Sequence, residues 1–326
     1  MPSQSFRHFA FITMIFTIFV ILWGAYVRAT GSGAGCGDHW PLCNGDVVPL
    51  EASVKTMIEF THRVTSGLAF LLVAFMWVWA KRKFSTWHVI PKLAFTAFML
   101  MIVESAVGAL IVLFKYVEYN DSWQRTIVTG VHLVNTLLLI GAIGLVWWEA
   151  RQACGERTGL TKVKAPFVRR SMAVLVLGFL LVSASGAIVA LGDTLFPAKS
   201  LLEGVKADFD PNSHFLVRLR IWHPVFAVVV SAALLIFGYF ANKKVLTRQC
   251  ENLFVTLSCL VFLQMALGAW NVVLLAPNYM QILHLASANA LWLTVVVYFW
   301  EIRKYTQPLG FLSPSVNASL STVQSK

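Results

Sequence analysis

The sequence predicts an all-α integral membrane protein of eight transmembrane helices, built as two duplicated four-helix bundles that run in parallel. Three observations predict this fold: an apolar composition, a series of long apolar runs and an internal repeat. Of 326 residues, 58% are hydrophobic and 13% are charged, and the mean hydropathy is +0.70. A soluble domain is about 45–50% apolar and about 25% charged, so this composition excludes an ordinary soluble domain.

Each apolar run is long enough to cross a bilayer as a helix, which takes about 20 residues. The runs cover residues 8–28, 57–80, 91–114, 126–150, 170–191, 217–241, 251–275 and 280–302. They are almost continuously apolar, whereas the strands of a membrane barrel would alternate apolar and polar residues. The first run has no small-residue cleavage site, so we expect an anchor helix rather than a signal peptide.

The net charge of +11 is a topology signal and does not indicate nucleic-acid binding. Basic clusters follow every second apolar run, as in Lys81-Arg82-Lys83, Arg169-Arg170 and Lys243-Lys244, and the alternate loops are less basic. Loops rich in Lys and Arg stay on the cytoplasmic side of a membrane. We therefore expect both termini to face the cytoplasm.

The second half of the chain repeats the first about 160 residues later, as expected from duplication of a four-helix unit. His62 is matched by His223, and His132-Leu-Val-Asn by His284-Leu-Ala-Ser-Ala-Asn. Two short glycine motifs are repeated as well, namely Gly24-Ala-Tyr-Val with Gly186-Ala-Ile-Val, and Ser105-Ala-Val-Gly108-Ala with Met265-Ala-Leu-Gly268-Ala. An even number of helices per unit makes the two repeats parallel.

This repeat divides the chain into four predicted parts. They are an N-terminal bundle (1–150), a cytoplasmic linker (151–169), a C-terminal bundle (170–304) and a polar, disordered tail (305–326).

Four histidines lie at one depth, each four to seven residues after the predicted start of its run and thus roughly 6–10 Å deep. They are His62, His132, His223 and His284. A single histidine in a membrane helix is often structural, but four in symmetric positions predict a pair of metallocofactor sites. Zinc or copper would be expected to recruit Cys or carboxylate ligands, so haem held by two imidazoles across each bundle fits better.

Glu59 breaks the symmetry of the two halves. It precedes His62 by three residues and so shares its helix face, whereas the aligned position in the second half is Arg220. An added acid or base predicts that chemistry occurs in the first half. The alternative is an i,i+4 ion pair with Arg63.

Other charged side chains near this layer have two interpretations each. Glu104 is deeper in the membrane, and a packing hydrogen bond is the favoured interpretation. Three arginines could pair with haem propionates or simply extend toward the membrane surface: Arg63, Arg218 and Arg220.

Cys36 and Cys43 lie in the first outer loop, where an oxidising compartment allows a disulfide. Two free thiols are the alternative. Zinc is disfavoured, because only Asp38 and His39 are close in sequence and there is no second pair of cysteines. The remaining cysteines are expected to be unpaired: Cys154, Cys250 and Cys259.

Two stretches together resemble the haem A synthase family, of the type with paired cysteines in the first outer loop. They are Gly24-Ala-Tyr-Val-Arg-Ala-Thr-Gly-Ser-Gly-Ala-Gly-Cys36-Gly-Asp-His-Trp-Pro-Leu-Cys43 and Glu59-Phe-Thr-His62-Arg63. The resemblance covers nearly the whole chain, including the eight runs and the four histidines. His39, between the cysteines, is a departure from the family pattern.

The resemblance implies an enzyme that oxidises the C8 methyl of haem O to a formyl group, giving haem A for terminal oxidases. It implies that His62 and His132 hold the substrate haem, that His223 and His284 hold a haem b cofactor, and that Glu59 handles protons or stabilises intermediates.

It further implies a Cys36–Cys43 disulfide over the substrate site, which faces the periplasm from the bacterial inner membrane. Expected partners are lipid around the farnesyl tail, haem O synthase, oxidase assembly factors and an electron donor that the sequence does not identify.

Two other classes of protein remain alternatives at this point. A non-enzymatic di-haem electron-transfer protein, similar in architecture to cytochrome b561, would leave both haems chemically unchanged and would not need Glu59. A transporter or haem-delivery protein would have helices broken near the membrane midplane. Against the latter, Pro91, Pro224 and Pro277 all lie near helix ends.

Overall fold

The computed structural model describes residues 4–50, 52–85, 88–152, 166–244 and 247–305, and these are mainly helical. Eight of the described helices, or helix pairs, are long and apolar enough to cross a membrane. The prediction of an all-α fold with eight membrane-length helices is therefore confirmed. The duplication of the chain and its orientation in a membrane stay predictions.

Four long helices form the first half of the molecule. They are α1 (Gln4–Ala29), α2 (Val54–Lys83), α3 (Val89–Leu113) and α4 (Trp123–Gln152). The start of α2 is fixed by Ser53, whose hydroxyl accepts a hydrogen bond from the Thr56 N–H at 3.2 Å. Its last turn carries Lys81, Arg82 and Lys83, cations that the negative end of the helix dipole favours.

Six helices form the second half, four of them long. They are α5 (Pro166–Leu195), α6 (Leu201–Phe209), α7 (Phe215–Arg218), α8 (Trp222–Lys244), α9 (Arg248–Val273) and α10 (Asn278–Tyr305).

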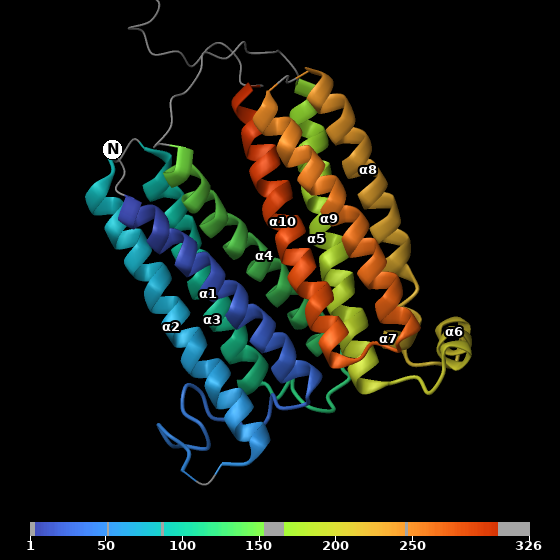
Figure 1. Ribbon diagram of the computed structural model, residues 1–326. Helices are drawn as coiled ribbons and strands as arrows, with labels where there is room; N and C mark the ends of the chain where they lie inside the picture. Colours follow the sequence, from blue (N-terminus) through green and yellow to red (C-terminus); the bar gives the residue numbers. More distant parts are fainter. Residues whose placement is uncertain (1–3, 51, 86–87, 153–165, 245–246, 306–326) are drawn as a thin grey trace, which may run out of the picture.

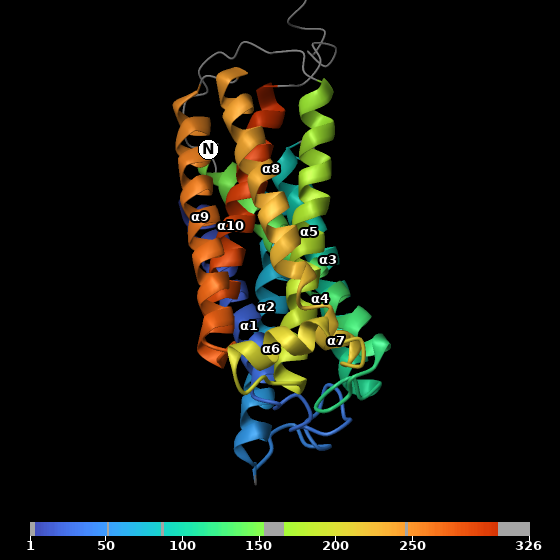
Figure 2. The same cartoon turned by 90° about the vertical axis from the view of Figure 1, so that its right-hand side faces the viewer.

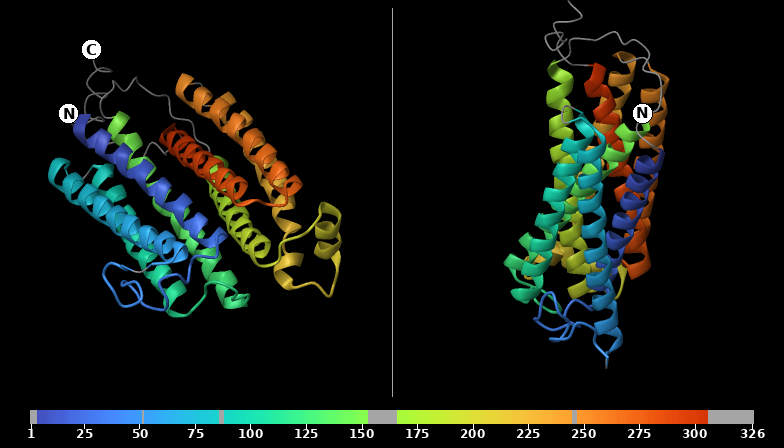
Figure 3. Two further views of the ribbon diagram at one scale, coloured as in Figure 1. Left: turned by 60° about the horizontal axis from the view of Figure 1, so that its bottom comes forward. Right: turned by 90° about the vertical axis from the view of Figure 1, so that its left-hand side faces the viewer.

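The helices pack as two side-by-side bundles (Figure 1). Helices α1 to α4 pack in a ring, each on its neighbours, and α5, α8, α9 and α10 do the same. Figures 2 and 3 show that the long helices of both bundles share one general direction. Loop 30–50 and α6 lie at the same end of the molecule, where α2, α4, α8 and α10 begin (Figure 1). We call this the loop end.

The interface between the bundles is formed by α1 and α4 on one side and α5 and α10 on the other. Helices α4 and α10 are the most deeply buried of the membrane-length helices. Trp292 of α10 is buried there and donates its indole N–H to the Leu137 carbonyl of α4 at 2.5 Å. A buried indole N–H needs a hydrogen-bond acceptor, and here that acceptor is a backbone carbonyl of the other bundle.

A reciprocal set of polar contacts, the inner clasp, joins the bundles at the end opposite the loop end. Trp148 donates to Glu301 across the interface at 2.7 Å, and Trp300 donates to Glu149 at 2.7 Å. Lys304 Nζ lies 2.6 Å from Glu149 and 2.7 Å from Glu301. The two buried carboxylates are thus both paired, as burial of charge requires.

Arg28 joins the bundles near the loop end. Its guanidinium leaves α1 and donates to the Ala190 carbonyl at 2.6 Å and the Thr194 hydroxyl at 2.8 Å in α5, and to Gln281 Oε1 at 2.8 Å in α10. One planar side chain thus ties three helices together.

The predicted run 217–241 is not one helix. The chain forms α7, turns at residues 219–221 and resumes as α8 at Trp222. The cause is Pro224, whose ring would collide with the carbonyl four residues earlier, at Arg220, in a continuous helix. His223 is consequently the second residue of its helix, not a residue one to two turns inside a longer one.

Sequence reasoning also missed α6, and most of the long helices extend beyond the predicted apolar runs, as α1 and α5 do. Ser200 caps α6 by accepting from the Glu203 N–H at 3.2 Å. Helix α5 begins within the linker that we predicted to span 151–169, of which residues 153–165 lie outside the described part of the chain. Residues 306–326 of the predicted tail, and Cys154, also lie outside it. Cys250 and Cys259 are unpaired.

Candidate functional site

Each of the four histidines packs against a glycine on a neighbouring helix of its own bundle. The pairs are Gly24 with His62, Gly108 with His132, Gly186 with His223, and Gly268 with His284. These are the glycines of the two repeated motifs. A Cβ at Gly24 or Gly186 would come within 2.9 Å of the partner's ring, a distance that real Cβ atoms essentially never show. At Gly268 the distance would be 3.2 Å and at Gly108 4.0 Å.

In the second half the two imidazoles face each other. The ring centroids of His223 and His284 are 6.4 Å apart and the rings are nearly perpendicular, at 81°. Two bonds of about 2 Å between a metal and an imidazole nitrogen, together with half of each ring, span about the same distance. A porphyrin supplies the other four iron ligands, so a pair of imidazoles suffices. This pair of residues fits a haem iron.

Both imidazoles of the second half have hydrogen-bond partners on neighbouring helices. His223 Nδ1 lies 3.0 Å from the Ser185 hydroxyl and 3.1 Å from the Val182 carbonyl. His284 Nε2 lies 3.0 Å from the Gln264 amide. Such contacts fix the orientation of a metal-ligating ring.

In the first half the partners differ. His132 Nδ1 lies 3.4 Å from Glu104 Oε1, and the ring of His62 has no hydrogen-bond partner among the described residues. Glu104 is itself held by Asn135 Nδ2 at 2.6 Å and by a short hydrogen bond from the Thr136 hydroxyl. The predicted packing hydrogen bond of Glu104 is confirmed, and the approach to His132 is an addition that sequence reasoning missed.

No group of three or more His, Cys, Asp or Glu side chains within the described ranges could hold a bare metal ion. The protein instead offers buried ring nitrogens without a hydrogen-bond partner, namely Nδ1 of His62 and of His284; Nδ1 of His132 also makes no hydrogen bond, but it lies 3.4 Å from Glu104 Oε1. Unpaired buried nitrogens of this kind are suited to a ligand that completes them.

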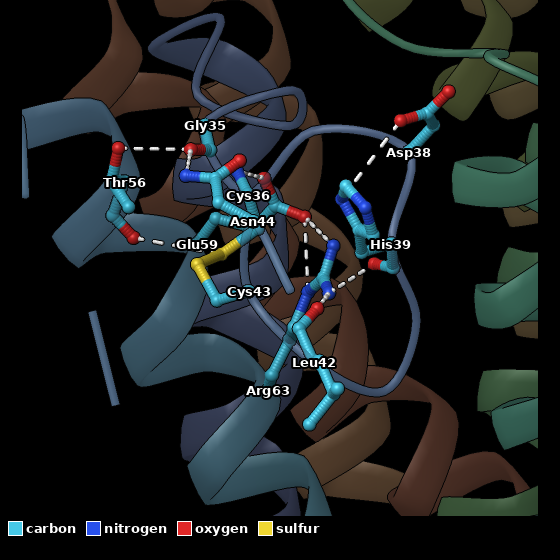
Figure 4. A network of polar contacts seen from close by, with 10 residues as sticks. All are labelled: Gly35, Cys36, Asp38, His39, Leu42, Cys43, Asn44, Thr56, Glu59 and Arg63. Carbon is cyan, nitrogen blue, oxygen red and sulfur yellow. Dashed lines mark hydrogen bonds and ion pairs between the residues drawn. A yellow bond between two sulfur atoms is a disulfide. The ribbon is translucent and has the colours of Figure 1, made fainter. Parts of the chain in front are cut away.

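Glu59 lies directly under the loop that carries the cysteines (Figure 4). Its side chain is buried, and Oε2 accepts the Cys36 backbone N–H at 2.9 Å. Arg63 donates to Oε1 from Nε at 3.1 Å and Nη2 at 2.5 Å, so the i,i+4 ion pair weighed from the sequence is present. Arg63 also donates to the carbonyls of His39 at 2.6 Å and Leu42 at 2.5 Å.

The structure contains the predicted Cys36–Cys43 disulfide, which excludes the free-thiol alternative for this pair. The loop is fastened to α2 a second time, because the Thr56 hydroxyl donates to the Gly35 carbonyl at 2.8 Å (Figure 4). Glu59, Arg63 and Thr56 of one helix therefore hold both sides of the disulfide. We call this arrangement the disulfide cap.

His39 contributes its backbone to the disulfide cap, and its imidazole is exposed beside Asp38 at 3.9 Å. Asp38 accepts from Lys115 at 2.9 Å, and this hydrogen bond lowers the pKa of the Asp38 carboxyl below its ordinary value. These surface charges belong to the loop end of the first half.

The arginines that we considered as propionate ligands have different hydrogen-bond partners. Arg220 donates to Asp208 Oδ1 at 2.9 Å and to Asp193 Oδ1 at 3.0 Å, which ties α6 to the end of α5. Arg218 makes a long contact of 3.5 Å with the Pro211 carbonyl. Where the first half pairs Glu59 with an arginine, the second half thus pairs an arginine with two aspartates, and propionate binding by these arginines stays a prediction.

Comparison with known proteins agrees with these features. The sequence profile of one family, COX15-CtaA ("Cytochrome oxidase assembly protein"), matches residues 7–296. A protein of Thermus thermophilus named "Protoheme IX farnesyltransferase" is 44% identical over 289 residues, which are 88% of this chain and 47% of the relative. The chain thus spans about half the length of that relative.

Two similar proteins are named "Heme A synthase". That of Exiguobacterium sibiricum is 29% identical over 279 residues, covering 84% of this chain and 87% of the relative. That of Alkalihalophilus pseudofirmus is 32% identical over 159 residues, covering 49% and 51%.

Proposed function

This chain belongs to the COX15-CtaA family, and on that premise we propose that it is a haem A synthase, a membrane oxidoreductase that converts haem O to haem A. The C8 methyl of the porphyrin is hydroxylated to the alcohol and then to the gem-diol, which loses water to leave a formyl group. Overall the carbon loses four electrons to an external oxidant and gains one oxygen atom. Haem A then serves terminal oxidases.

This proposal rests on one observation: the two halves are similar, but they carry different side chains around their histidine pairs. Both have a glycine-backed pair of histidines, yet only the first adds a buried carboxylate, Glu59, under a disulfide. A protein that only transferred electrons between two haems would not need this addition. An enzyme needs a group that handles protons at one haem only.

We assign His62 and His132 to the substrate haem and His223 and His284 to a haem b cofactor. When bound, haem b supplies a redox-active iron for electron delivery. The two sites correspond to an N-terminal bundle (1–150) and a C-terminal bundle (170–304), joined through residues 151–169.

Glu59 is the proposed proton-handling group. A proton accepted at Oε2 would compete with the Cys36 N–H for the same oxygen, while Arg63 keeps Oε1 in place. Proton uptake would therefore loosen the disulfide cap over the substrate. Arg63 contributes orientation, because its fork holds the carboxylate and two loop carbonyls at once.

The proposed location is a bacterial inner membrane with both haem sites toward the periplasm. The first partner is the enzyme that farnesylates haem, which supplies haem O. In support, relatives from Thermus named protoheme IX farnesyltransferase contain a region similar to this chain as about half of their length. A site between membrane helices also suits a farnesyl tail, which lipid can surround.

The proposal is tested by extracting the haems from purified protein produced in cells that supply haem O, followed by mass analysis. Wild type is compared with Glu59→Gln and with Glu203→Gln, a control on the exposed surface of α6. We expect haem b with haem O, a hydroxylated intermediate or haem A in wild type and control. The Glu59 variant should stop at haem O or an intermediate. Haem b alone in all three proteins would overturn the proposal and leave an electron-transfer cytochrome.

A further inference from the structure

We propose that Glu104 is a positioning residue that makes His132 the firmly held ligand of the first-half haem, so that His62 is the ligand that is exchanged. This inference rests on the proposed function, since it requires a haem between His62 and His132. It concerns which side of that haem becomes accessible to a small molecule.

The Glu104 carboxylate is held in place by hydrogen bonds. Both of its carboxylate oxygens are engaged by α4, the helix of His132, through Asn135 at 2.6 Å and Thr136. Asn135 also donates to the Leu100 carbonyl of α3 at 3.0 Å. The carboxylate is thus fixed between α3 and α4, with Oε1 only 3.4 Å from His132 Nδ1. A small rotation of the imidazole completes an N–H···carboxylate hydrogen bond.

Among the described residues, His62 has no side chain beside it that corresponds to Glu104. Nδ1 of both His62 and His132 makes no hydrogen bond within the described part of the chain, but only His132 has a carboxylate beside it, at 3.4 Å. The His62 ring is packed tightly against Gly24 instead. Its counterpart His223 is held by Ser185 and the Val182 carbonyl. The position that aligns with Ser185, one residue before the glycine of the repeated motif, is Trp23, whose indole donates instead to the Ile58 carbonyl at 3.1 Å.

The second half has a residue that matches Glu104, beside the second histidine of its pair. Glu104 aligns with Gln264, and the Gln264 amide nitrogen lies 3.0 Å from Nε2 of His284, whereas Glu104 approaches Nδ1 of His132. The two halves therefore place a side chain of the same shape beside the second histidine of each pair, charged in one and neutral in the other. The chain thus contains its own comparison of a carboxylate with an amide.

A carboxylate that accepts the outer N–H of a ligating imidazole raises the basicity of that ligand and fixes its orientation. A neutral amide raises the basicity of the ligand less, and an imidazole without a partner gains no basicity in this way. The pair His132 and His62 is thus strongly unequal, whereas His223 and His284 both have neutral partners. We infer one exchangeable position in the molecule, on α2, the helix that also carries Glu59.

The test exchanges the two partners in the full-length, haem-loaded protein. Glu104→Gln gives the first half the partner of the second, and Gln264→Glu does the reverse. Redox titration followed by absorption should show the potential of one haem moving up in Glu104→Gln, because ferric iron loses a stronger donor. The potential of the other haem should move down in Gln264→Glu. A merely structural role would move neither in this opposed manner.

A second measurement addresses exchange directly, with cyanide as the probe of ferric iron. His62→Ala should keep the first-half haem and bind cyanide more tightly than wild type, whereas His132→Ala should lose that haem. Retention of haem by His132→Ala together with its loss from His62→Ala would overturn the inference. So would unchanged potentials in both exchange variants with haem content intact.

Failure of this inference is distinguishable from failure of the proposed function. Absence of a haem from the first half of the wild-type protein would refute the proposed site itself. If Glu104→Gln does not retain haem, the potential of the second-half haem in Gln264→Glu decides, because that variant leaves the first half untouched.

Discussion

The two halves share a framework but differ in what surrounds it. In both, two histidines near the loop end each pack on a glycine of the long helix that precedes their own. In the first half the adjoining loop is closed by a disulfide and fastened by Glu59 and Arg63. In the second half the adjoining segment is α6, fastened by Arg220 to Asp193 and Asp208.

In the proposed enzyme, the features that both halves share would serve haem binding, and Glu59 with the disulfide cap, present in the first half, would serve chemistry. A glycine behind an imidazole is needed wherever the ring must stand close to a helix. A buried carboxylate under a covalently closed loop is not needed to hold a haem, and it occurs on one side only.

The largest effect is expected from filling the glycine positions. Gly24→Ala places a Cβ 2.9 Å from the His62 ring, and Gly186→Ala does the same to His223. Overpacking of this kind costs about 1–3 kcal/mol, and about 1.4 kcal/mol corresponds to a tenfold change in an equilibrium constant. Each variant should lose haem from its own half and keep it in the other, as measured by haem content and mass analysis.

Two matched variants control this experiment. Gly108→Ala adds a Cβ at 4.0 Å from His132, an ordinary contact, and Gly67→Ala adds one with nothing within 4 Å. Both should retain haem in both halves. Equal loss of haem in all four variants would mean that helix stability, and not the space for the imidazole, determines haem content.

An effect confined to the first outer loop, without loss of haem, is expected from opening the disulfide. A bond that closes so short a loop contributes about 2–3 kcal/mol. The double variant Cys36→Ser/Cys43→Ser should therefore speed local hydrogen exchange at the backbone amide of position 36 by roughly 30- to 140-fold. Amides of α6 should exchange as in wild type. Acceleration in α6 as well would show that the two ends of the halves are coupled.

The smallest effect is expected from the surface pair of Asp38 and Lys115. The hydrogen bond lowers the Asp38 pKa, so the pair stabilises the fold above the unfolded-state pKa of about 4 and less as pH falls through the native value. Because the carboxyl is exposed, the effect is small. Thermal unfolding of wild type and Asp38→Asn should differ slightly at pH 6 and converge near pH 3. A difference that grows toward pH 3 would contradict this sign.

The eight helices could be predicted from the sequence because hydropathy alone specifies them. The turn between α7 and α8 was missed, although its cause, Pro224, is visible in the sequence: an apolar run gives no sign of a local break. Helix α6 was missed because nine residues are too few for a periodic signal to stand out.

At the site, five residues could be selected from the sequence, four because they follow the internal repeat and one because it breaks it. They are His62, His132, His223 and His284, and Glu59. Their partners could not, because Ser185, Gln264 and Glu104 are ordinary residues whose importance depends on side-chain direction. One signal was available for two of them: Glu104 and Gln264 align in the repeat. Arg63 was weighed as a propionate ligand, yet its contacts to Glu59, His39 and Leu42 appear only once the loop is folded over α2.

The inner clasp has a consequence for electron flow in the proposed enzyme. Trp148 and Trp300 each donate across the interface, and Lys304 binds the carboxylates of both bundles. With Arg28 at the other end, the interface is fastened at two levels and resists sliding or hinging. Electron tunnelling between cofactors weakens steeply with distance. In the proposed enzyme, an interface fastened in two places would hold the two bound haems at one separation and so keep the rate of electron transfer between them steady.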